Sequence, residues 1–234
     1  MKTKYFALFM FSICKFTFAD INPEINMPAD FNGDNFIARE INDNSSISYN
    51  TAESSGCSII KFKEYRAPPK NKVSSEVNNP TNTFPVNTWV CLSSDTVYSN
   101  GYDRSMNEKI VYSRSKSLWV KANNKKSEII PSDQDGPYKS LKLYNIKAKN
   151  AEGYVVFDEN ITKDDKETYK NAKELVSFCL VQDSTYSALC GSGGLASDSS
   201  QIPYILKTFE SMEIGLDNKA NEKMLNGSNK SKVN

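Results

Sequence analysis

The sequence contains no histidine. This absence excludes the Ser-His-Asp and Cys-His catalytic arrangements and the histidine-based zinc hydrolases, and it removes the commonest general base at neutral pH. A pair of carboxylates can hydrolyse glycosides without histidine, but no two of the 28 acidic residues are marked by their spacing for that role. We therefore expect no enzymatic activity, no catalytic residue and no cofactor.

Long apolar runs are also lacking. Two lysines precede the apolar run Tyr5–Phe11, and the N-terminal segment ends on the small residue Ala19. This pattern is typical of a secretory signal, and the run is too short to span a bilayer. Lipid attachment at Cys14 is disfavoured, because the three residues before it lack the small residue that a lipoprotein signal places there. We expect residues 1–19 to be a signal peptide and the protein to be exported to the periplasm, with no integral membrane segment.

The chain has no large excess of one charge. It contains 29 basic and 28 acidic residues, and three of the basic residues but none of the acidic ones lie in residues 1–19, so the remainder carries a net charge of −2. A near-neutral exported protein has no electrostatic reason to bind nucleic acid.

Cysteine is scarce, and its placement is informative. Two apolar arms, Leu175–Val181 and Tyr186–Cys190, flank the polar residues 182–185, which is typical of a short antiparallel hairpin. Cys179 and Cys190 are equally far from the turn centre, so they face each other across the ladder. Opposed residues have Cα atoms about 4.5 to 5.5 Å apart, within the range that a disulfide needs. We predict the disulfide Cys179–Cys190.

The other two cysteines outside the signal are Cys57 and Cys91. An even number of cysteines in an exported chain indicates disulfides, and if the hairpin takes its own pair, Cys57 must bond to Cys91. Closing that loop would stabilise the fold by roughly 3 to 4 kcal/mol in the chain-entropy model. Metal binding by cysteines alone is opposed by the oxidising compartment. The segment Asp30–Asp34 resembles the start of a calcium loop but departs from the rest of its pattern, so we predict no metal site.

A helix follows the hairpin. Apolar residues recur at spacings of three and four over Gln201–Met212, with Gly215 placed to end the helix, and Gly191–Gly194 is expected to be a flexible link before it. Such a helix must cover something apolar, most simply the sheet of the hairpin. We therefore predict an α+β fold, mainly antiparallel β-sheet, with a C-terminal helix packed on a disulfide-bonded hairpin.

Residues of this C-terminal region carry a resemblance. Phe178-Cys179-Leu180, Ala188–Gly193, Ile205-Leu206-Lys207 and Ser211-Met212-Glu213 resemble the C-terminal block of periplasmic immunity proteins paired with type VI secretion effectors, particularly the lipase-directed ones. The resemblance covers about the last quarter of the ordered chain and consists of structural residues. It implies a protein that binds and blocks a toxin.

The rest of the chain is predicted to form one secreted domain over residues 20–214, followed by a disordered tail at 215–234 with almost nothing to bury. Two loop segments, 66–85 and 123–137, are alternative sub-boundaries. Residues 162–173 are highly charged, and we expect a solvated connector there. The remaining strands are predicted at 57–65, 86–92, 109–113, 117–122, 139–148 and 152–158.

Two binding functions follow. The leading hypothesis is a periplasmic immunity protein that binds and neutralises a secreted antibacterial effector. The alternative is an adhesin, a pilus-associated subunit or another structural subunit of the envelope, which would need a donor strand near its N-terminus; residues 21–30 make a poor one, because Pro23 and Pro28 interrupt them. Interfaces are anchored by aromatic residues and arginine, and the loop candidates for such anchors are Tyr98, Tyr102, Tyr138, Arg104 and Arg114.

Overall fold

The structure describes the folded core of the chain and one isolated residue before it. The computed structural model describes residues 27, 36–42, 47–49, 56–67, 84–104, 108–123, 137–196 and 199–215. The predicted signal peptide, the Asp30–Asp34 segment, the predicted tail after Gly215 and most of the loops 66–85 and 123–137 lie outside these residues.

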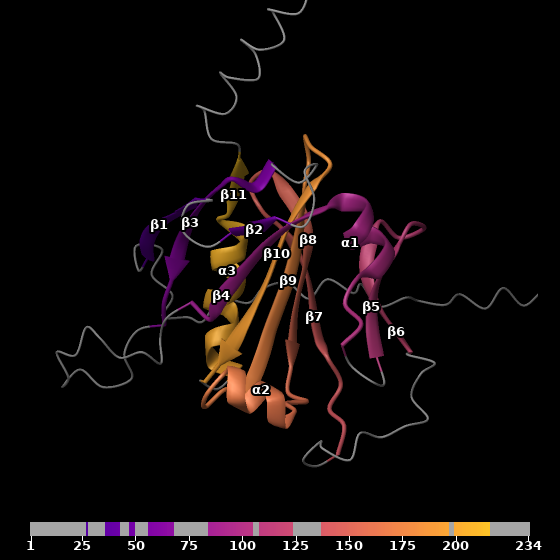
Figure 1. Cartoon of the computed structure of the whole chain (residues 1–234), viewed down its shortest axis with the longest axis vertical. Helices are drawn as coiled ribbons and strands as arrows, with labels where there is room; N and C mark the ends of the chain where they lie inside the picture. The colour runs from indigo at the N-terminus through magenta and orange to yellow at the C-terminus, as the bar shows by residue number, and fades with distance from the viewer. Residues whose placement is uncertain are drawn as a thin grey trace, which may run out of the picture.

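A six-stranded sheet forms the centre of the molecule, in the order β2-β4-β10-β9-β8-β7 (Figure 1). Neighbouring strands are antiparallel, except that β2 and β4 are parallel. The fold is therefore mostly antiparallel β-sheet, as predicted, with a few helices and two disulfides. The strands are β2 Ile47–Tyr49, β4 Val86–Ser93, β7 Lys142–Lys147, β8 Ala151–Asp158, β9 Glu174–Gln182 and β10 Ser187–Leu195.

Smaller elements cover both faces of this sheet (Figure 1). One face, which we call the inner face, is covered by α3 and a three-stranded sheet in the order β1-β3-β11. The opposite face, which we call the outer face, is covered by α1 and the β5–β6 hairpin. A short helix, α2, leads into β9. These elements are β1 Phe36–Asn42, β3 Ile59–Tyr65, α1 Ser94–Asn100, β5 Glu108–Ser113, β6 Leu118–Asn123, α2 Lys163–Thr168, α3 Ile202–Glu210 and β11 Glu213–Gly215.

Strands in the middle of the sheet are apolar on both faces because both faces are covered. In β8, Val155 and Phe157 belong to the inner core, whereas Tyr154 and Val156 belong to the outer one. Side chains alternate between the two faces along a strand, so a strand covered on both sides reads as a continuous apolar run. This is why the sequence of β8 shows no alternation of polar and apolar residues.

Both predicted disulfides are present. Cys179 and Cys190 are direct partners in the β9–β10 ladder, with Cα atoms 4.1 Å apart. Cys57 bonds to Cys91 across 34 residues, with Cα atoms 5.9 Å apart. The first bond lies on the outer face, and the second is fully buried in the inner core.

The prediction of a flexible glycine link was wrong, because Gly191, Gly193 and Gly194 lie inside β10. A Cβ at Gly191 would come within 2.4 Å of the Thr88 carbonyl oxygen and 2.7 Å of the Phe178 ring, and one at Gly193 within 1.8 Å of the Pro85 carbonyl oxygen. Glycine in a strand often marks a close backbone approach. Here these glycines let neighbouring chain segments pack against β10.

The helices also differ from expectation. The helix predicted at Gln201–Met212 begins at Ile202 and ends at Glu210, and Gly215 belongs to β11 instead of ending the helix. The charged segment after residue 161 contains α2 instead of only a connector; its Thr162 caps the helix and forms a capping box with Asp165. Helix α1 was not predicted. Within the described residues, no helix is long and apolar enough to cross a membrane.

Candidate functional site

One side chain at the edge of the main sheet pairs with the backbone of the β5–β6 hairpin. Asn145 on β7 accepts a hydrogen bond from the Trp119 backbone N–H at 2.8 Å and donates one to the Trp119 carbonyl at 3.1 Å. A carboxamide can pair both backbone groups because it carries a donor and an acceptor. Asn145 therefore replaces a strand-to-strand backbone pairing and fixes Trp119 over the outer face of the sheet.

Substitution of Asn145 by Ala should loosen this attachment. We expect Asn145→Ala to lower the free energy of unfolding by about 1 to 3 kcal/mol, because two half-buried backbone groups of Trp119 lose their partners. Asn123→Ala, at the exposed end of the same hairpin, is the matched control and should stay within about 0.5 kcal/mol of wild type. Urea denaturation measures both; equal stability of the two variants would contradict the role of Asn145.

Four aromatic rings meet where this hairpin lies on the sheet. Trp119 is buried and contacts Tyr154 with ring centroids 4.6 Å apart. Tyr98 of α1 lies parallel to Trp119 at 5.8 Å, with an interplanar angle of 1°. The Tyr112 ring meets Tyr98 at 4.7 Å and Trp119 at 5.3 Å, edge-on to both. Stacked and edge-to-face pairs are the preferred geometries of aromatic side chains, so the rings hold one another in fixed positions.

A cavity of about 190 Å³ opens beside these rings, between the β5–β6 hairpin and the β7–β8 end of the sheet. We call it the aromatic pocket. Its lining combines aromatic faces with one acidic, one basic and one amide side chain. The lining residues are Tyr98, Tyr112, Ser117, Leu118, Trp119, Asn145, Ile146, Lys147, Glu152 and Gly153.

Two tyrosines that are linked through helix α1 reach solvent. Tyr98 is 37% exposed, and Tyr186, at the β9–β10 turn, is 83% exposed. The Tyr186 carbonyl accepts a hydrogen bond from the Ser94 N–H at 2.7 Å, which joins the turn to the start of α1. We define the tyrosine surface as Tyr98, Tyr112 and Tyr186 together with the two carboxylates beside them, Glu152 and Asp183.

The surroundings of Tyr98 are acidic. Burial raises the pKa of the Tyr98 hydroxyl, and Tyr112, Glu152 and Asp183 raise it further. Among the described residues, neither Glu152 nor Asp183 forms an ion pair. The tyrosine surface thus presents neutral phenols next to carboxylates that no basic side chain of the described chain neutralises.

The anchor candidates taken from the sequence are distributed over several roles. Tyr98 belongs to the tyrosine surface, and Arg114 is exposed in the β5–β6 turn. Tyr102 is 8% exposed and donates to Asp158 at 3.1 Å, so it holds the fold together and is no anchor. Arg104 pairs with Asp165 of α2, and the Tyr138 hydroxyl donates to Glu108 at 3.0 Å.

Sequence reasoning missed Tyr112, Trp119 and Tyr186. The first two were read as strand residues, and they reach the site because the β5–β6 hairpin lies against the sheet, where Asn145 on β7 pairs with the Trp119 backbone. Tyr186 had a usable signal, since it is a large ring directly after the four polar turn residues 182–185. A side chain beside a tight turn has few neighbours to cover it.

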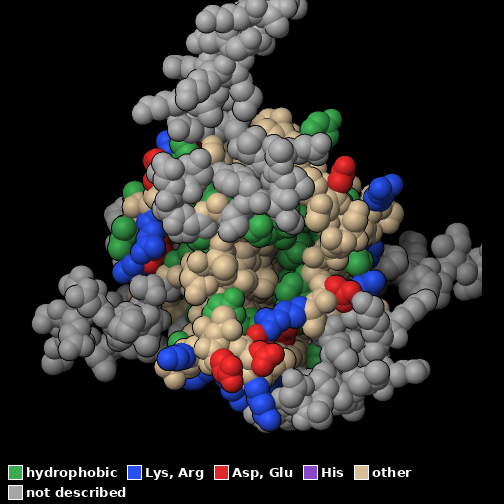
Figure 2. Space-filling view, viewed as in Figure 1, with side chains coloured by type: hydrophobic (Ala, Val, Ile, Leu, Met, Phe, Trp, Pro, Cys, Tyr) green, Lys and Arg blue, Asp and Glu red, His purple; other side chains and the backbone are tan. Residues whose placement is uncertain are grey.

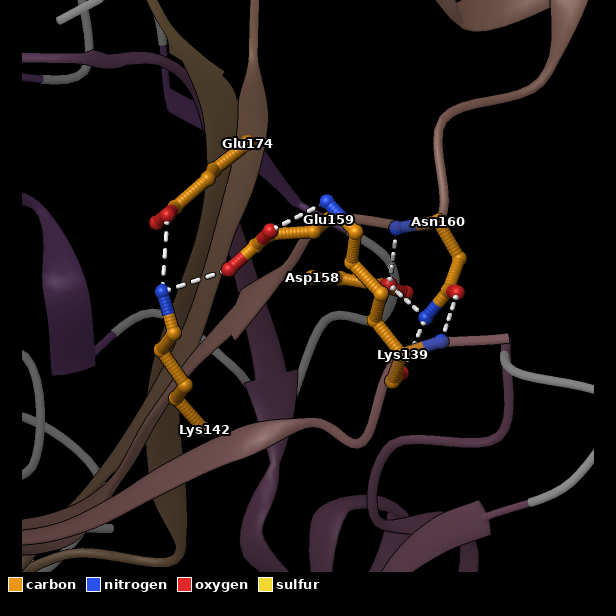
Figure 3. Close-up of polar contacts among 6 residues, drawn as sticks. All are labelled: Lys139, Lys142, Asp158, Glu159, Asn160 and Glu174. Carbon is orange, nitrogen blue, oxygen red and sulfur yellow. Dashed lines mark hydrogen bonds and ion pairs between the residues drawn. The ribbon is translucent and has the colours of Figure 1, made fainter. Parts of the chain in front are cut away.

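A second cluster lies where β7 begins and β8 ends (Figure 3). Separately, Figure 2 shows acidic and basic side chains gathered at the bottom of the view, where α2 lies in Figure 1. By contrast, hydrophobic side chains are visible in a hollow between the central strands and the α1–β5 layer (Figure 2). In the charged cluster, Lys142 Nζ lies 2.7 Å from Glu159 and 2.8 Å from Glu174. Lys139 Nζ contacts the other oxygen of Glu159 at 2.7 Å.

The protonation states of this cluster favour a structural role over acid–base catalysis. Lys139 and Lys142 hold the pKa of Glu159 at about 2, below its ordinary value of 4.5. Burial acts to lower the pKa of Lys142, but the contacts with Glu159 and Glu174 raise it overall. A general acid or base works best with a pKa near the working pH, and both shifts lead away from neutrality. The Lys142–Glu159 contact connects the start of β7 to the chain that leaves β8.

These contacts predict a defined pH dependence. Because the folded-state pKa of Glu159 is depressed, its contribution to stability is present above about pH 4.5 and is lost as the pH falls toward 2. We expect wild type to be more stable than Glu159→Gln at neutral pH and the two to converge near pH 2. Thermal unfolding from pH 7 to pH 2 measures this difference; a constant gap over the whole range would contradict it.

No group of three or more Cys, Asp or Glu side chains in the described residues is arranged to hold a metal ion. Comparisons with known protein families, with curated proteins and with solved structures give no match for this chain.

Proposed function

We propose that this protein is an exported, non-catalytic binding protein that uses the tyrosine surface to bind and neutralise a secreted antibacterial effector in the periplasm. One observation carries the proposal: Tyr98 and Tyr186, linked through the start of α1, are 37% and 83% exposed, and within the described residues neither Glu152 nor Asp183 beside them has an ion-pair partner. Tyrosine is enriched among the residues that contribute most to protein–protein binding.

The frame behind this surface is rigid. The Tyr186 turn is closed by the Cys179–Cys190 disulfide and attached to α1 through the Ser94 N–H. Tyr98 is held by ring contacts with Tyr112 and Trp119. A surface that is already ordered loses less conformational entropy when a partner binds, so its exposed rings contribute more of their contact energy to affinity.

Export is supported by the signal-like residues 1–19 and by the two disulfides, which persist in oxidising compartments. The resemblance to immunity proteins supports the choice of partner. Its residues Phe178–Leu180 and Ala188–Gly193 lie in the paired strands β9 and β10. They form the scaffold of the tyrosine surface and do not line the surface itself.

We also propose that the hairpin holds α3 in place. The ring of Phe209, on α3, lies 4.7 Å from that of Phe178, on β9, and both side chains belong to the inner core. The helix also contacts the small sheet, where the Tyr65 N–H donates to Thr208 Oγ1 at 3.0 Å.

The function is tested with residues 20–234, produced with both disulfides formed. This protein is used to capture periplasm-targeted products of the neighbouring reading frames, and each captured product is then tested for toxicity and for growth rescue by co-expression. We expect one toxic product to be captured in stoichiometric amount and its toxicity to be suppressed.

The variant Tyr98→Ala/Tyr186→Ala should lose both capture and rescue, whereas the control Ile37→Ala should keep them. Ile37 is a suitable control because it is 46% exposed and lies on β1, in the layer that covers the opposite face of the sheet. Self-assembly into surface polymers without capture of a toxic product would overturn the proposal and favour an envelope structural subunit.

A further inference from the structure

We propose that the aromatic pocket receives a basic side chain, Arg or Lys, of the partner protein. This inference rests on the proposed function, because it names the chemical group that the tyrosine surface recognises.

The size of the pocket suits a single side chain. Its volume of about 190 Å³ is below the roughly 300 to 1,000 Å³ of pockets that enclose small molecules. Tyr98 and Tyr112 line it, and Trp119 forms the wall behind Tyr98. The faces of aromatic rings carry partial negative charge and attract cations within about 6 Å. A guanidinium or ammonium group in this pocket would therefore lie against aromatic rings, whereas outside the pocket it would contact only water.

Charge complementarity supports the same occupant. Glu152 lines the pocket, and Asp183 lies close enough to Tyr98 to act on its hydroxyl. Neither carboxylate has an ion-pair partner within the described part of the chain. Elsewhere in the described residues, exposed carboxylates such as Glu40 and Glu213 do pair with lysines. Within the described residues, no basic side chain therefore competes with a charge from outside for these two carboxylates.

Lys147 is the basic group nearest to this arrangement, and it does not occupy the pocket as an ion-pair partner. It is opposite Glu152 in the β7–β8 register, but it is exposed and forms no ion pair with described residues. Within the described residues, Lys147 therefore leaves Glu152 available to a basic group of the partner.

The pocket is tested without any knowledge of the partner. ¹⁵N-labelled protein, residues 20–234, is titrated with N-acetylarginine methylamide and separately with its neutral isostere, N-acetylcitrulline methylamide, while amide spectra are recorded. We expect the arginine probe to shift the signals of Tyr98, Glu152 and Gly153 and to bind about 5-fold or more tightly than the citrulline probe. The variant Glu152→Gln/Asp183→Asn should keep the wild-type spectrum but lose this preference.

Equal binding of the two probes, or shifts located elsewhere, would overturn the inference. Failure of the proposed function is distinguishable from this result. If the arginine probe is preferred but no toxic product is captured, the pocket is assigned correctly and the proposed function fails. If a toxic product is captured and suppressed while the two probes bind equally, the proposed function stands. The inference that the aromatic pocket receives a basic side chain then fails.

Discussion

Glu64→Ala is expected to lower the free energy of unfolding by about 2 to 4 kcal/mol, because it removes a buried carboxylate from two arginines whose side chains stay partly exposed, at 43% for Arg39 and 25% for Arg66. Glu64 lies on β3 and its side chain is 1% exposed. Arg66 Nε lies 2.7 Å from one carboxylate oxygen, and the Phe84 N–H donates to the same oxygen at 3.1 Å. Arg39 Nε lies 2.6 Å from the other oxygen, outside hydrogen-bond geometry, so that contact is an ion pair only.

The carboxylate thus joins three chain segments that are distant in the sequence. Without it, the Phe84 N–H loses its partner, and two arginines of like charge lie next to each other. Glu40→Ala is the matched control, because Glu40 lies on the neighbouring strand, is 53% exposed and is 3.8 Å from Lys61; exposed pairs contribute about 0 to 1 kcal/mol. Urea denaturation compares the two variants, and a loss below about 1 kcal/mol for Glu64→Ala would contradict this account.

Phe209→Ala should cost a similar amount, about 3 to 5 kcal/mol, because it removes a large ring from a close-packed core. Phe209 is completely buried and contacts the rings of Phe84 at 5.2 Å and Phe178 at 4.7 Å. Phe209→Leu keeps most of the volume and should cost less. Chemical denaturation measures both variants, and an equal loss for the two would contradict this account, because the volume that leucine retains would then contribute nothing to stability.

The same residue tests the proposed attachment of α3 to the hairpin. In a double-mutant cycle of Phe178→Ala and Phe209→Ala, we expect a coupling free energy of about 0.5 to 1.5 kcal/mol, the range found for aromatic pairs. A second double-mutant cycle, of Phe84→Ala and Phe209→Ala, measures the coupling free energy between α3 and the loop before β4. Additive effects of Phe178→Ala and Phe209→Ala would contradict the hairpin attachment.

Local signals in the sequence were sufficient for the C-terminal hairpin and for the helix α3. The equal distances of Cys179 and Cys190 from the turn fixed a register that the structure shares, because the side-chain period of a strand leaves no freedom for a slip of one residue. The apolar stripe of α3 was readable for a similar reason, since Ile202, Ile205 and Phe209 all lie on its buried face.

Short helices and close contacts between backbone segments could not be predicted from the sequence. Helix α1 buries only Ser94 and Val97, which are too few to give the repeating apolar pattern that marks a helix in a sequence. Its capping residue, Ser93, does accept a hydrogen bond from the Thr96 N–H, but a serine alone is too common to mark a helix. Position 193 in β10 has room only for glycine, because the backbone of Pro85, over 100 positions away in the sequence, approaches it closely. No local sequence pattern contains that information.

The tyrosine surface depends on contacts between distant segments, and the sequence revealed only part of it. Tyr98 was singled out as a loop aromatic, but Tyr112 and Trp119 join it through Asn145, 26 residues beyond Trp119. Tyr102 was singled out for the same reason as Tyr98 and proved to be buried against Asp158. The charge triad at Glu64 was equally hidden, since Arg39 lies on another strand.

The most direct test of the account is the dissociation constant of the captured effector for Tyr98→Ala/Tyr186→Ala, compared with that for Ile37→Ala. Two central tyrosines at about 2 kcal/mol or more each predict that the double variant binds at least about 700-fold more weakly. The control should bind within about twofold of wild type. An unchanged dissociation constant for the double variant, with its fold intact, would show that the tyrosine surface is not the binding site.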